Sequence, residues 1–410
     1  MVITFQNTVH RLVYLLYYSG AQADEAKSYL RVLEQIVSNT DYELQETFQV
    51  FITNMVNRRV KLAVSRSVLN EAINKLTRLP DRIAFDLCKF ALVRLKPRII
   101  CFEEHVCSIL QHIGTIMERF RMFRQAAETL LTVPLERGHR RYTAEYKFDT
   151  YVRIARLFLE ADDVRKAEFH IKRAAQLQKE VTDKPKIILY KESYASILDH
   201  ARKFIEAARQ YVELSAISNK CMSFLRKAFI CIALSTTGEQ RTHILFLLLK
   251  DERTKILPGS ALIGKLYYNV IIKRSDLKDF EAILQPHHKI PTPDGLTLLE
   301  RAINEHNLLS VSKVYNDISF EQLAALFETT PTYVQIIAAD LISNGRIPAI
   351  IDQIRNSLVF ENRREVPLID MQIKSLCNQL NSIFNKIAVE NPAWLAKIET
   401  EIAEENDKKY

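Results

Sequence analysis

The chain has 410 residues, of which 48% are hydrophobic and 26% charged, enough for two or three domains with ordinary cores and too apolar for general disorder. Only 8 glycines occur, fewer than the tight turns and phosphate loops of sheet-rich or doubly wound folds need, so the composition favours helices. The net charge of +8 is mild and scattered. It does not indicate the concentrated basic stripe of a protein that binds nucleic acid through charge.

The cysteines and the apolar runs bear on where the protein resides. No CxxC pair occurs, and all the cysteines fall inside helical patterns, so we expect reduced thiols in the cytoplasm and nucleus. The apolar run at residues 12–18 lacks a small-residue cleavage site, and the run at 244–249 is far shorter than the roughly 20 residues of a membrane span, so neither a signal peptide nor a span is expected. The cysteines are Cys88, Cys101, Cys107, Cys221, Cys231 and Cys377.

The first part of the chain, to about Pro97, is predicted to be helical, with breaks at Pro80 and Pro97. Three stretches then look alike, each with a large apolar residue three positions before an alanine. They begin at Phe123, Val164 and Phe204, and their alanines lie 41 and 40 residues apart.

Apolar helical segments precede and follow each of these stretches, so the repeating unit is predicted to be helix, turn, helix. A small residue lets two helices approach closely, and one pair cannot bury its apolar face alone. We therefore predict that residues 1–295 form a stacked helical array that resembles degenerate tetratricopeptide repeats.

A segment with three prolines and a glycine, residues 286–295, is predicted to end this array. One helix is expected at residues 298–309. A second is expected to start at Ser319, a good N-cap, with Gln322 completing a capping box.

A third helix is expected to open at Pro331 and to close at Gly345. Two short segments rich in branched and aromatic residues follow, at 347–353 and 357–361, and predict a hairpin. Three helices followed by a hairpin is the order of a winged helix, which we assign to residues 296–364.

The most regular pattern in the chain comes after Pro367. Six apolar residues are spaced 4, 3, 4, 3, 4, which predicts a heptad seam. Asn391-Pro392 is expected to restart a helix. Residues 365–410 are therefore predicted to be assembly helices, and because a small domain offers little surface to cover the seam, an intermolecular bundle is favoured. The seam consists of Ile369, Ile373, Leu376, Leu380, Ile383 and Ile387.

Motifs for catalysis are missing: GxxxxGK[ST], GxGxxG, HExxH and GxSxG do not occur. Cys101, His105, Cys107 and His112 cannot converge on one ion from a single helix, so core roles are expected for them. His287-His288 is expected to be an exposed pair. We expect no enzyme activity, no cofactor and no metal site.

Nucleic acid is a second possible partner, because many winged helices read DNA. Residues 332–344 contain neither Lys nor Arg, and their one charge is Asp340. Arg355 and Arg363-Arg364 could contact a phosphate backbone weakly. Protein contact through the hairpin is therefore favoured, with Leu358 and Phe360 facing one side of the strand.

Helical repeats that lead into a winged helix resemble the PCI module, which the proteasome lid, the COP9 signalosome and a translation initiation factor complex share. Several stretches are similar to the subunit 4 family of the signalosome, from about residue 79 to the C-terminal helix. They are Leu79-Pro-Asp81, Lys96-Pro-Arg-Ile-Ile-Cys-Phe-Glu-Glu104, Lys203-Phe-Ile-Glu-Ala-Ala208, Lys250-Asp-Glu-Arg253, Glu305-His-Asn-Leu-Leu-Ser310, Val314-Tyr-Asn316, Ser319-Phe-Glu-Gln-Leu323 and Ile351-Asp-Gln353.

The resemblance implies a non-catalytic scaffold in a complex that removes Nedd8 from cullins, the hydrolysis belonging to another subunit. It also implies that winged helices pair edge to edge, that C-terminal helices gather into a bundle, and that the N-terminal arm holds the cullin–RING ligase. The implied contact residues are Ile351, Leu358 and Phe360, together with the seam. A proteasome-lid scaffold, a nucleic-acid-binding winged helix and an enzyme with an unrecognised site are the alternatives.

Overall fold

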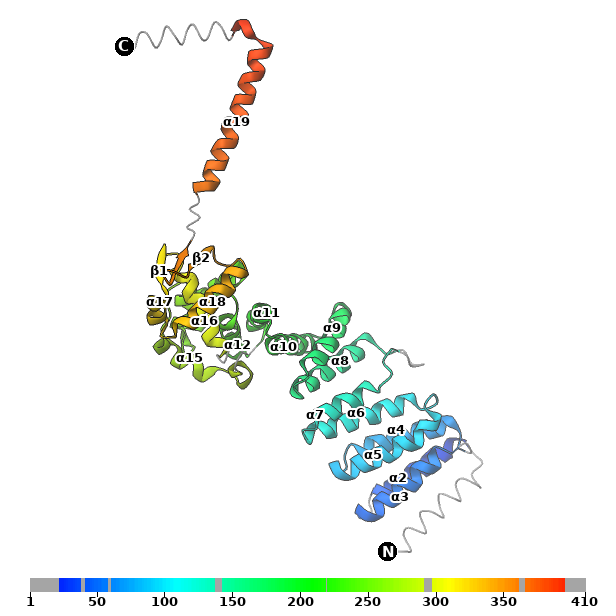
Figure 1. Cartoon of the computed structure of the whole chain (residues 1–410). Helices are drawn as coiled ribbons and strands as arrows, with labels where there is room; N and C mark the ends of the chain where they lie inside the picture. The colour runs from blue at the N-terminus through cyan, green and yellow to red at the C-terminus, as the bar shows by residue number, and fades with distance from the viewer. Residues whose placement is uncertain are drawn as a thin grey trace, which may run out of the picture. The chain divides into compact units, whose positions relative to one another are not determined.

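The computed structural model describes residues 22–37, 41–57, 60–136, 142–218, 220–290, 297–360 and 366–394. The chain divides into two compact units, Met1–Leu257 and Pro258–Tyr410 (Figure 1). This division by packing falls before the proline-rich segment at 286–295, and the domain boundaries at residues 295 and 364 stay predictions. Among the described helices, none combines the length and the apolarity that a membrane span requires.

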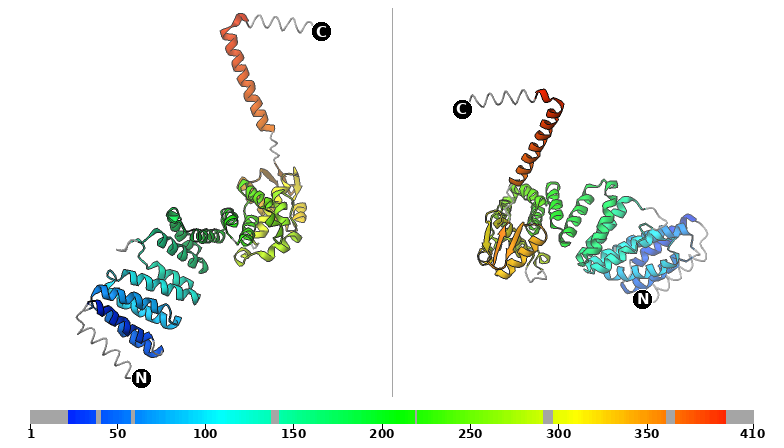
Figure 2. Two further views of the ribbon diagram at one scale, coloured as in Figure 1. Left: turned by 180° about the vertical axis from the view of Figure 1, so that it is seen from behind. Right: turned by 45° about the horizontal axis from the view of Figure 1, so that its top comes forward.

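The first unit is built from helices that pack against near neighbours in the chain, and at its N-terminal end α2 contacts α4 and α3 contacts α5. Figure 2 shows these N-terminal helices stacked side by side. This confirms the predicted helical array. The helices are α2 (Gln22–Val37), α3 (Asp41–Met55), α4 (Leu62–Leu76), α5 (Asp81–Leu95), α6 (Glu103–Arg119), α7 (Phe123–Leu131), α8 (Ala144–Glu160), α9 (Val164–Leu177), α10 (Lys184–His200), α11 (Phe204–Ile217), α12 (Cys221–Leu234) and α13 (Glu239–Lys250), with short 3-10 turns η1 (Lys96–Arg98), η2 (Gln178–Glu180) and η3 (Glu252–Ile256).

The three repeats predicted from sequence share one turn geometry. Arg121, Asp162 and Arg202 each lie two residues before the second helix of a pair and take a left-handed backbone, with φ of 58°, 61° and 61°. The residue after each donates its N–H to the carbonyl five residues back, at 2.9 Å in all three turns. This is the Schellman helix end, which satisfies carbonyls that the helix leaves free.

The repeat alanines lie where the paired helices touch. Ala126, Ala167 and Ala207 are fully buried. Gly114 on α6 serves the same close approach, because a Cβ atom there would lie 3.1 Å from the side chain of Leu130 on α7. Small side chains at these positions let two helices pack tightly enough to form a continuous core.

A buried histidine belongs to this core. His170 on α9 stacks on Phe158, with ring centroids 5.7 Å apart, and on Tyr151, at 6.4 Å. Its Nδ1 has no hydrogen-bond partner among the described atoms. Burial lowers the pKa of His170 to about 4, because the cation is poorly solvated between aromatic rings.

The second unit contains the winged helix. The described elements are α14 (Ala261–Tyr267), η4 (Arg274–Leu277), α15 (Lys278–Ile283), η5 (Pro286–Lys289), α16 (Leu298–Val311), β1 (Asp317–Ser319), α17 (Phe320–Phe327), α18 (Pro331–Ser343), β2 (Ala349–Asp352), β3 (Ser357–Phe360) and α19 (Val366–Glu390).

The winged helix holds a three-stranded antiparallel sheet of order β1-β3-β2. Strands β2 and β3 form the predicted hairpin, whereas β1 was not foreseen. Ile318 of β1 pairs with Leu358 of β3, and Ile351 of β2 pairs with Leu358 from the other side. The last strand in sequence is therefore the middle strand of the sheet.

Helix ends in this unit follow the predicted chemistry. Ser319 caps α17 by accepting the N–H of Gln322 at 3.3 Å, which is one half of the predicted capping box, and Pro331 opens α18. Gly345 follows α18 with φ of +66°, a conformation that glycine adopts without strain. Thr297 and Glu300 form a full, reciprocal capping box at α16.

The expectation of an exposed histidine pair is wrong for one member. His288 lies in η5, which packs against α16, and it is 2% exposed, whereas His287 is half-buried. The prolines of this segment suggested an open linker, but a short 3-10 turn returns part of it to the core.

Candidate protein-interaction surfaces

The hairpin places its predicted contact residues differently from expectation. Leu358 and Phe360 are buried in the winged-helix core with residues of α16, α17 and α18. Ile351 is half-buried against the same core. The expectation that Leu358 and Phe360 face a partner is therefore wrong: β3 has a strand on each side, and its alternate residues point into the core.

Residues that sequence reasoning missed are the exposed ones of the same hairpin. Ile350, on the opposite face of β2, is largely exposed, and Ile354 in the turn is 98% exposed. In the described sheet β2 is an outer strand, so the backbone groups on its free side are available to a neighbouring strand. Neighbouring residues of a strand face opposite sides, so Ile350 and Ile351 could not both be covered by one core, but the sequence alone did not say which of them was exposed.

Helix α18, the counterpart of a DNA-reading helix, presents an uncharged surface. Ile336 on this surface is 54% exposed, and Gln335 donates through Nε2 to Oδ1 of Asn356 in the hairpin turn, at 2.8 Å. The single charge, Asp340, accepts from Nη2 of Arg301 at 3.0 Å. Phosphate recognition needs cations on this surface, and α18 supplies none.

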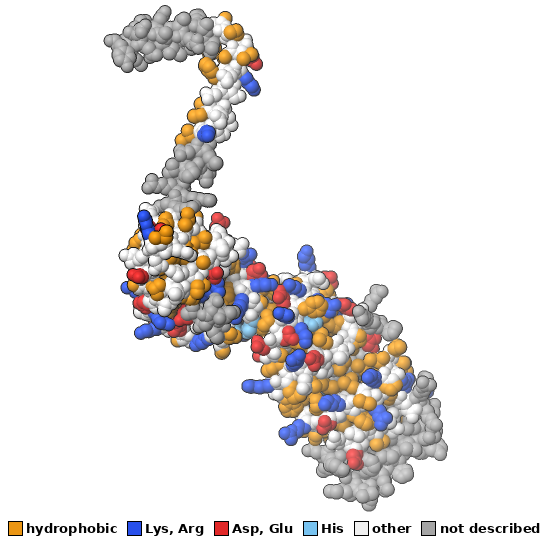
Figure 3. Space-filling view, in the orientation of Figure 1, with side chains coloured by type: hydrophobic (Ala, Val, Ile, Leu, Met, Phe, Trp, Pro, Cys, Tyr) orange, Lys and Arg blue, Asp and Glu red, His pale blue; other side chains and the backbone are white. Residues whose placement is uncertain are grey.

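Helix α19 carries the heptad seam. Ile373, Leu376, Leu380 and Ile383 are each more than half exposed, and Figure 3 shows hydrophobic side chains along this helix. Ile387 is half-buried, and Ile369 lies in the helix although its side chain falls outside the described residues. Four large aliphatic side chains in one exposed row mark an interaction surface.

Two of the residues considered as metal ligands, His105 and Cys107, have separate partners. His105 is buried, with its Nε2 2.8 Å from the carbonyl oxygen of Arg66. Sγ of Cys107 lies 2.8 Å from the hydroxyl oxygen of Tyr142. These contacts hold α6 to its neighbours, and they agree with the core roles expected from helix geometry.

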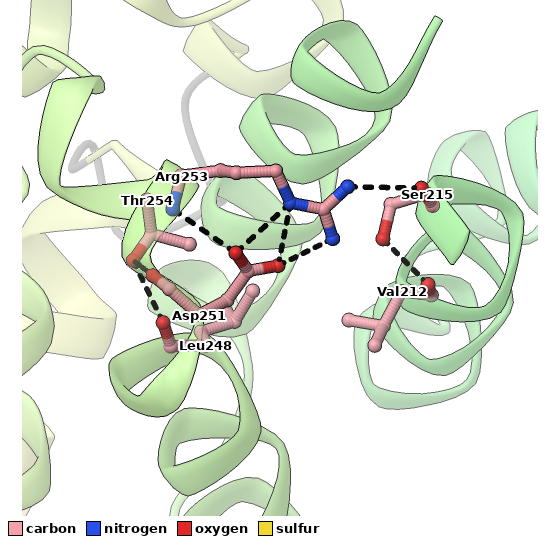
Figure 4. A network of polar contacts seen from close by, with 6 residues as sticks. All are labelled: Val212, Ser215, Leu248, Asp251, Arg253 and Thr254. Carbon is pink, nitrogen blue, oxygen red and sulfur yellow. Dashed lines mark hydrogen bonds and ion pairs between the residues drawn. The ribbon is translucent and has the colours of Figure 1, made fainter. Parts of the chain in front are cut away.

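Two of the stretches that carry the family resemblance are packing motifs. In the first, Arg253 donates from Nε and Nη2 to both carboxylate oxygens of Asp251, at 2.9 and 2.6 Å, and from Nη1 to the carbonyl of Ser215 at 3.4 Å (Figure 4). The hydrogen bonds from Arg253 lower the pKa of Asp251. The pair thereby joins η3 to the end of α11.

The second motif lies on α16. Asn307 is buried, accepts the N–H of Ile272 at 2.8 Å and donates to the carbonyl of Ile272 at 2.9 Å. Glu305 accepts from Nη1 of Arg346 at 2.7 Å. The amide and the carboxylate thus fix neighbouring segments of the second unit to α16, rather than facing an open site.

Comparisons with known sequences match three successive parts of the chain. Residues 9–220 match the family described as PSMD12/CSN4, N-terminal, residues 277–362 match the PCI domain, and residues 365–401 match the CSN4/RPN5/eIF3a helix turn helix domain. COP9 signalosome complex subunit 4 of Drosophila melanogaster is 43% identical over 389 residues, which cover 94% of this chain and 96% of that protein.

More distant relatives carry the same name. COP9 signalosome complex subunit 4 of Dictyostelium discoideum is 33% identical over 93% of this chain and 98% of its own length. The Arabidopsis thaliana protein of that name is 34% identical over 90% of this chain and 95% of its own. The chain belongs to the COP9 signalosome subunit 4 family.

One of the family matches lies at the end of the described chain. The helix turn helix match covers residues 365–401, which include all of α19. Helix α19 ends at Glu390, and residues 392–394 are helical again after Asn391, as Asn391-Pro392 predicted. The family resemblance therefore extends over the surface with the most exposed apolar side chains.

Proposed function

We propose that the chain is a non-catalytic scaffold and substrate-binding subunit of the COP9 signalosome, the complex that removes Nedd8 from cullins. The observation that carries the proposal is the exposed seam of α19 in a chain so similar to signalosome subunits. The seam joins a helical bundle of other subunits, and the outer strand β2 pairs with a neighbouring winged helix. The N-terminal helices hold the cullin–RING ligase, in the cytoplasm and the nucleus.

The exposed seam supports assembly because contact between apolar side chains and water is unfavourable. Burying apolar surface contributes about 25 cal/mol per Å², so a row of aliphatic side chains stabilises a bundle by several kcal/mol. The seam keeps its spacing without a polar interruption from Ile369 to Ile387. That spacing fits the packing of side chains between parallel or antiparallel helices.

A scaffold role also agrees with the way the polar groups are used. Glu305, Asp251 and Asn307 are held by partners within their own unit. Such groups stabilise packing within the unit. The hydrolytic step is assigned to a different subunit of the complex.

Affinity purification of the tagged full-length chain, with mass spectrometry, tests the proposal. Leu376→Asp with Leu380→Asp is expected to reduce recovery of signalosome subunits at least about 100-fold, since two buried charges cost the bundle about 3 kcal/mol or more. A chain that ends at residue 364 should behave likewise. Gln372→Asp with Lys386→Asp is the matched control, on the same helix and outside the seam.

The outcomes separate the alternatives. Undiminished recovery with the seam variants would contradict the bundle. Recovery of proteasome-lid subunits would keep the architecture and assign the chain to that complex. Recovery of nucleic acid, with an affinity that falls steeply as salt rises, would favour the winged helix as a nucleic-acid reader.

A further inference from the structure

The second unit contains a cavity of about 230 Å³ beside the connection between α17 and α18. This connection, helix α16 and the segment that leads into and through η4 supply its walls. Much of the wall is apolar, and each side chain of the apolar part is itself buried. These side chains are Ile272, Leu277, Ile303 and Phe327.

Two polar groups of the cavity wall have no hydrogen-bond partner within the described part of the chain. Asn304 of α16 is 6% exposed, and no hydrogen bond joins its side-chain amide to any described residue. The hydroxyl oxygen of Thr329 is buried and also lacks a partner among these residues. Because a buried amide or hydroxyl without a partner is costly, most such groups in proteins are paired. Both groups therefore point to a ligand.

Asn307, about one turn further along α16, shows how the chain satisfies such a group. It is 1% exposed, and the N–H and carbonyl of Ile272 pair with the two halves of its amide, at 2.8 and 2.9 Å. Asn304 is buried almost as deeply, but its side chain lines the cavity. Asparagine suits neither a helix interior nor an apolar core unless it is hydrogen-bonded. Packing within the chain does not explain Asn304.

The polar part of the wall is held in place by the backbone. Glu328 ends α17 in a left-handed conformation, with φ of 55°, and the N–H of Thr329 donates to the carbonyl of Ala324 at 3.0 Å. The carbonyl of Thr330 then accepts the N–H of Val334 in the first turn of α18, at 3.2 Å. A wall fixed in this way loses little conformational freedom when a ligand binds.

The charges around the cavity argue against a charged ligand. Arg274 pairs with Glu300 at 3.0 Å, so this cation is already engaged. Glu328 adds an exposed carboxylate, which repels an anion. The unpaired groups inside are an amide and a hydroxyl, which carry no charge and suit an uncharged group that hydrogen-bonds.

Size and hydrogen bonding narrow the ligand further. Pockets for drug-sized ligands have volumes of roughly 300–1,000 Å³, so this smaller cavity suits one ring-sized group. Tyrosine combines a ring for the apolar wall with a hydroxyl that both donates and accepts, as Asn304 and Thr329 require. Tryptophan only donates, through its indole N–H, and phenylalanine does neither.

We propose that the cavity is an anchor site for a tyrosine side chain of another protein. The ring contacts Ile303 and Phe327, and the hydroxyl donates to the side-chain carbonyl of Asn304 and accepts from the hydroxyl of Thr329. A buried aromatic anchor in a preformed pocket is the kind of contact that dominates binding energy at protein interfaces. The proposal goes beyond the role of α19, because none of the cavity wall belongs to that helix.

Titration of the purified full-length chain, followed by saturation-transfer NMR of the ligand, tests the proposal. The probes are N-acetyltyrosinamide, N-acetylphenylalaninamide and p-cresol, which is the tyrosine side chain without a backbone. N-acetyltyrosinamide is expected to bind about 10-fold more tightly than N-acetylphenylalaninamide, because a phenyl ring leaves the amide and the hydroxyl of the cavity unpaired. p-Cresol should compete with N-acetyltyrosinamide for the same site.

Two variants of the cavity and one matched control locate the binding. Thr329→Val removes the hydroxyl and keeps the shape, so the affinity for N-acetyltyrosinamide should fall about 5-fold. Asn304→Leu should abolish the preference for tyrosine over phenylalanine. Thr332→Val, the same change on an exposed residue outside the cavity wall, should bind as the wild-type chain does. Urea unfolding checks that each variant is folded, and the isosteric Thr329→Val keeps the test valid if Asn304→Leu is not.

The results that would overturn the proposal are distinct. Equal affinity for the two amides, a tyrosine preference that survives both cavity variants, or no binding of any probe would each contradict a tyrosine site. Binding of p-cresol without N-acetyltyrosinamide would mean that the cavity admits no polypeptide, and would exclude a protein partner. The seam variant Leu376→Asp with Leu380→Asp tests the proposed function separately, so either proposal can fail while the other stands.

Discussion

The hairpin of the winged helix and helix α19 hold the same kinds of residue in opposite environments. Leu358 on β3 is 0% exposed, whereas Leu380 on α19 is 63% exposed. Both belong to regular apolar patterns, and both were expected to contact a partner. The difference teaches that an apolar pattern predicts burial, and that only the neighbouring elements decide whether the chain itself supplies the cover.

The largest expected effect comes from making the same leucine-to-alanine change at the buried and at the exposed position. Leu358→Ala should lower the free energy of unfolding of the second unit by about 2–5 kcal/mol, because it leaves a cavity in a packed core. Leu380→Ala, the same change on α19, should alter it by less than about 0.5 kcal/mol. Urea unfolding of the isolated full-length chain measures both, and equal losses would mean that α19 packs on its own chain.

Two asparagines, Asn307 and Asn378, test the same difference between a buried and an exposed position. Asn307→Ala should cost about 1–3 kcal/mol of unfolding free energy, since it leaves the buried N–H and carbonyl of Ile272 without partners. Asn378→Ala on α19 should be neutral or slightly stabilising in the isolated chain, because alanine favours the helix. A loss at Asn378 comparable to that at Asn307 would contradict the exposure of Asn378 on α19.

The sequence predicted the helices well where chemistry was local. The repeats begin at Phe123, Val164 and Phe204, which are the first residues of α7, α9 and α11. Spacing and caps determine these starts, so neighbouring residues contain the information. Neighbouring residues did not suffice to predict the burial of Leu358 and Phe360. Strand β1 lies about 40 residues earlier, and only pairing with β1 makes β3 the middle strand.

Acid should affect the helical array through His170. Its pKa of about 4 lies below the ordinary value of 6.5, so the unfolded chain binds the proton first as the pH falls. Stability from this group is complete above about pH 6.5 and is lost as the pH drops towards 4, by roughly 1–3 kcal/mol.

His170→Phe should remove that part of the pH dependence, because a phenyl ring keeps the stacking on Phe158 and cannot be protonated. His243→Phe on the exposed surface of α13 is the control and should leave the slope unchanged. Unfolding free energies measured from pH 7 to pH 4 test the pair. A slope that survives in His170→Phe would assign it to other groups.

The smallest expected effect concerns the repeat turns. Arg202→Gly should raise the free energy of unfolding by about 0.5–1 kcal/mol, because glycine takes the left-handed backbone without the strain of a side chain. Arg202→Ala keeps that strain and should bring no gain. Thermal unfolding compares the two, and a loss on introducing glycine would show that the Arg202 side chain stabilises the turn.

The middle position of β3 has a consequence for how the protein is made. Strands β1 and β2 do not pair with each other. Each pairs with β3, which is synthesised after both of them. Until Phe360 has emerged, the core beneath Leu358 stays open, and two unpaired strands lie exposed to other chains. Folding of the winged helix is thus held back until its last strand is synthesised, while the earlier helical pairs, whose contacts are local, can already form.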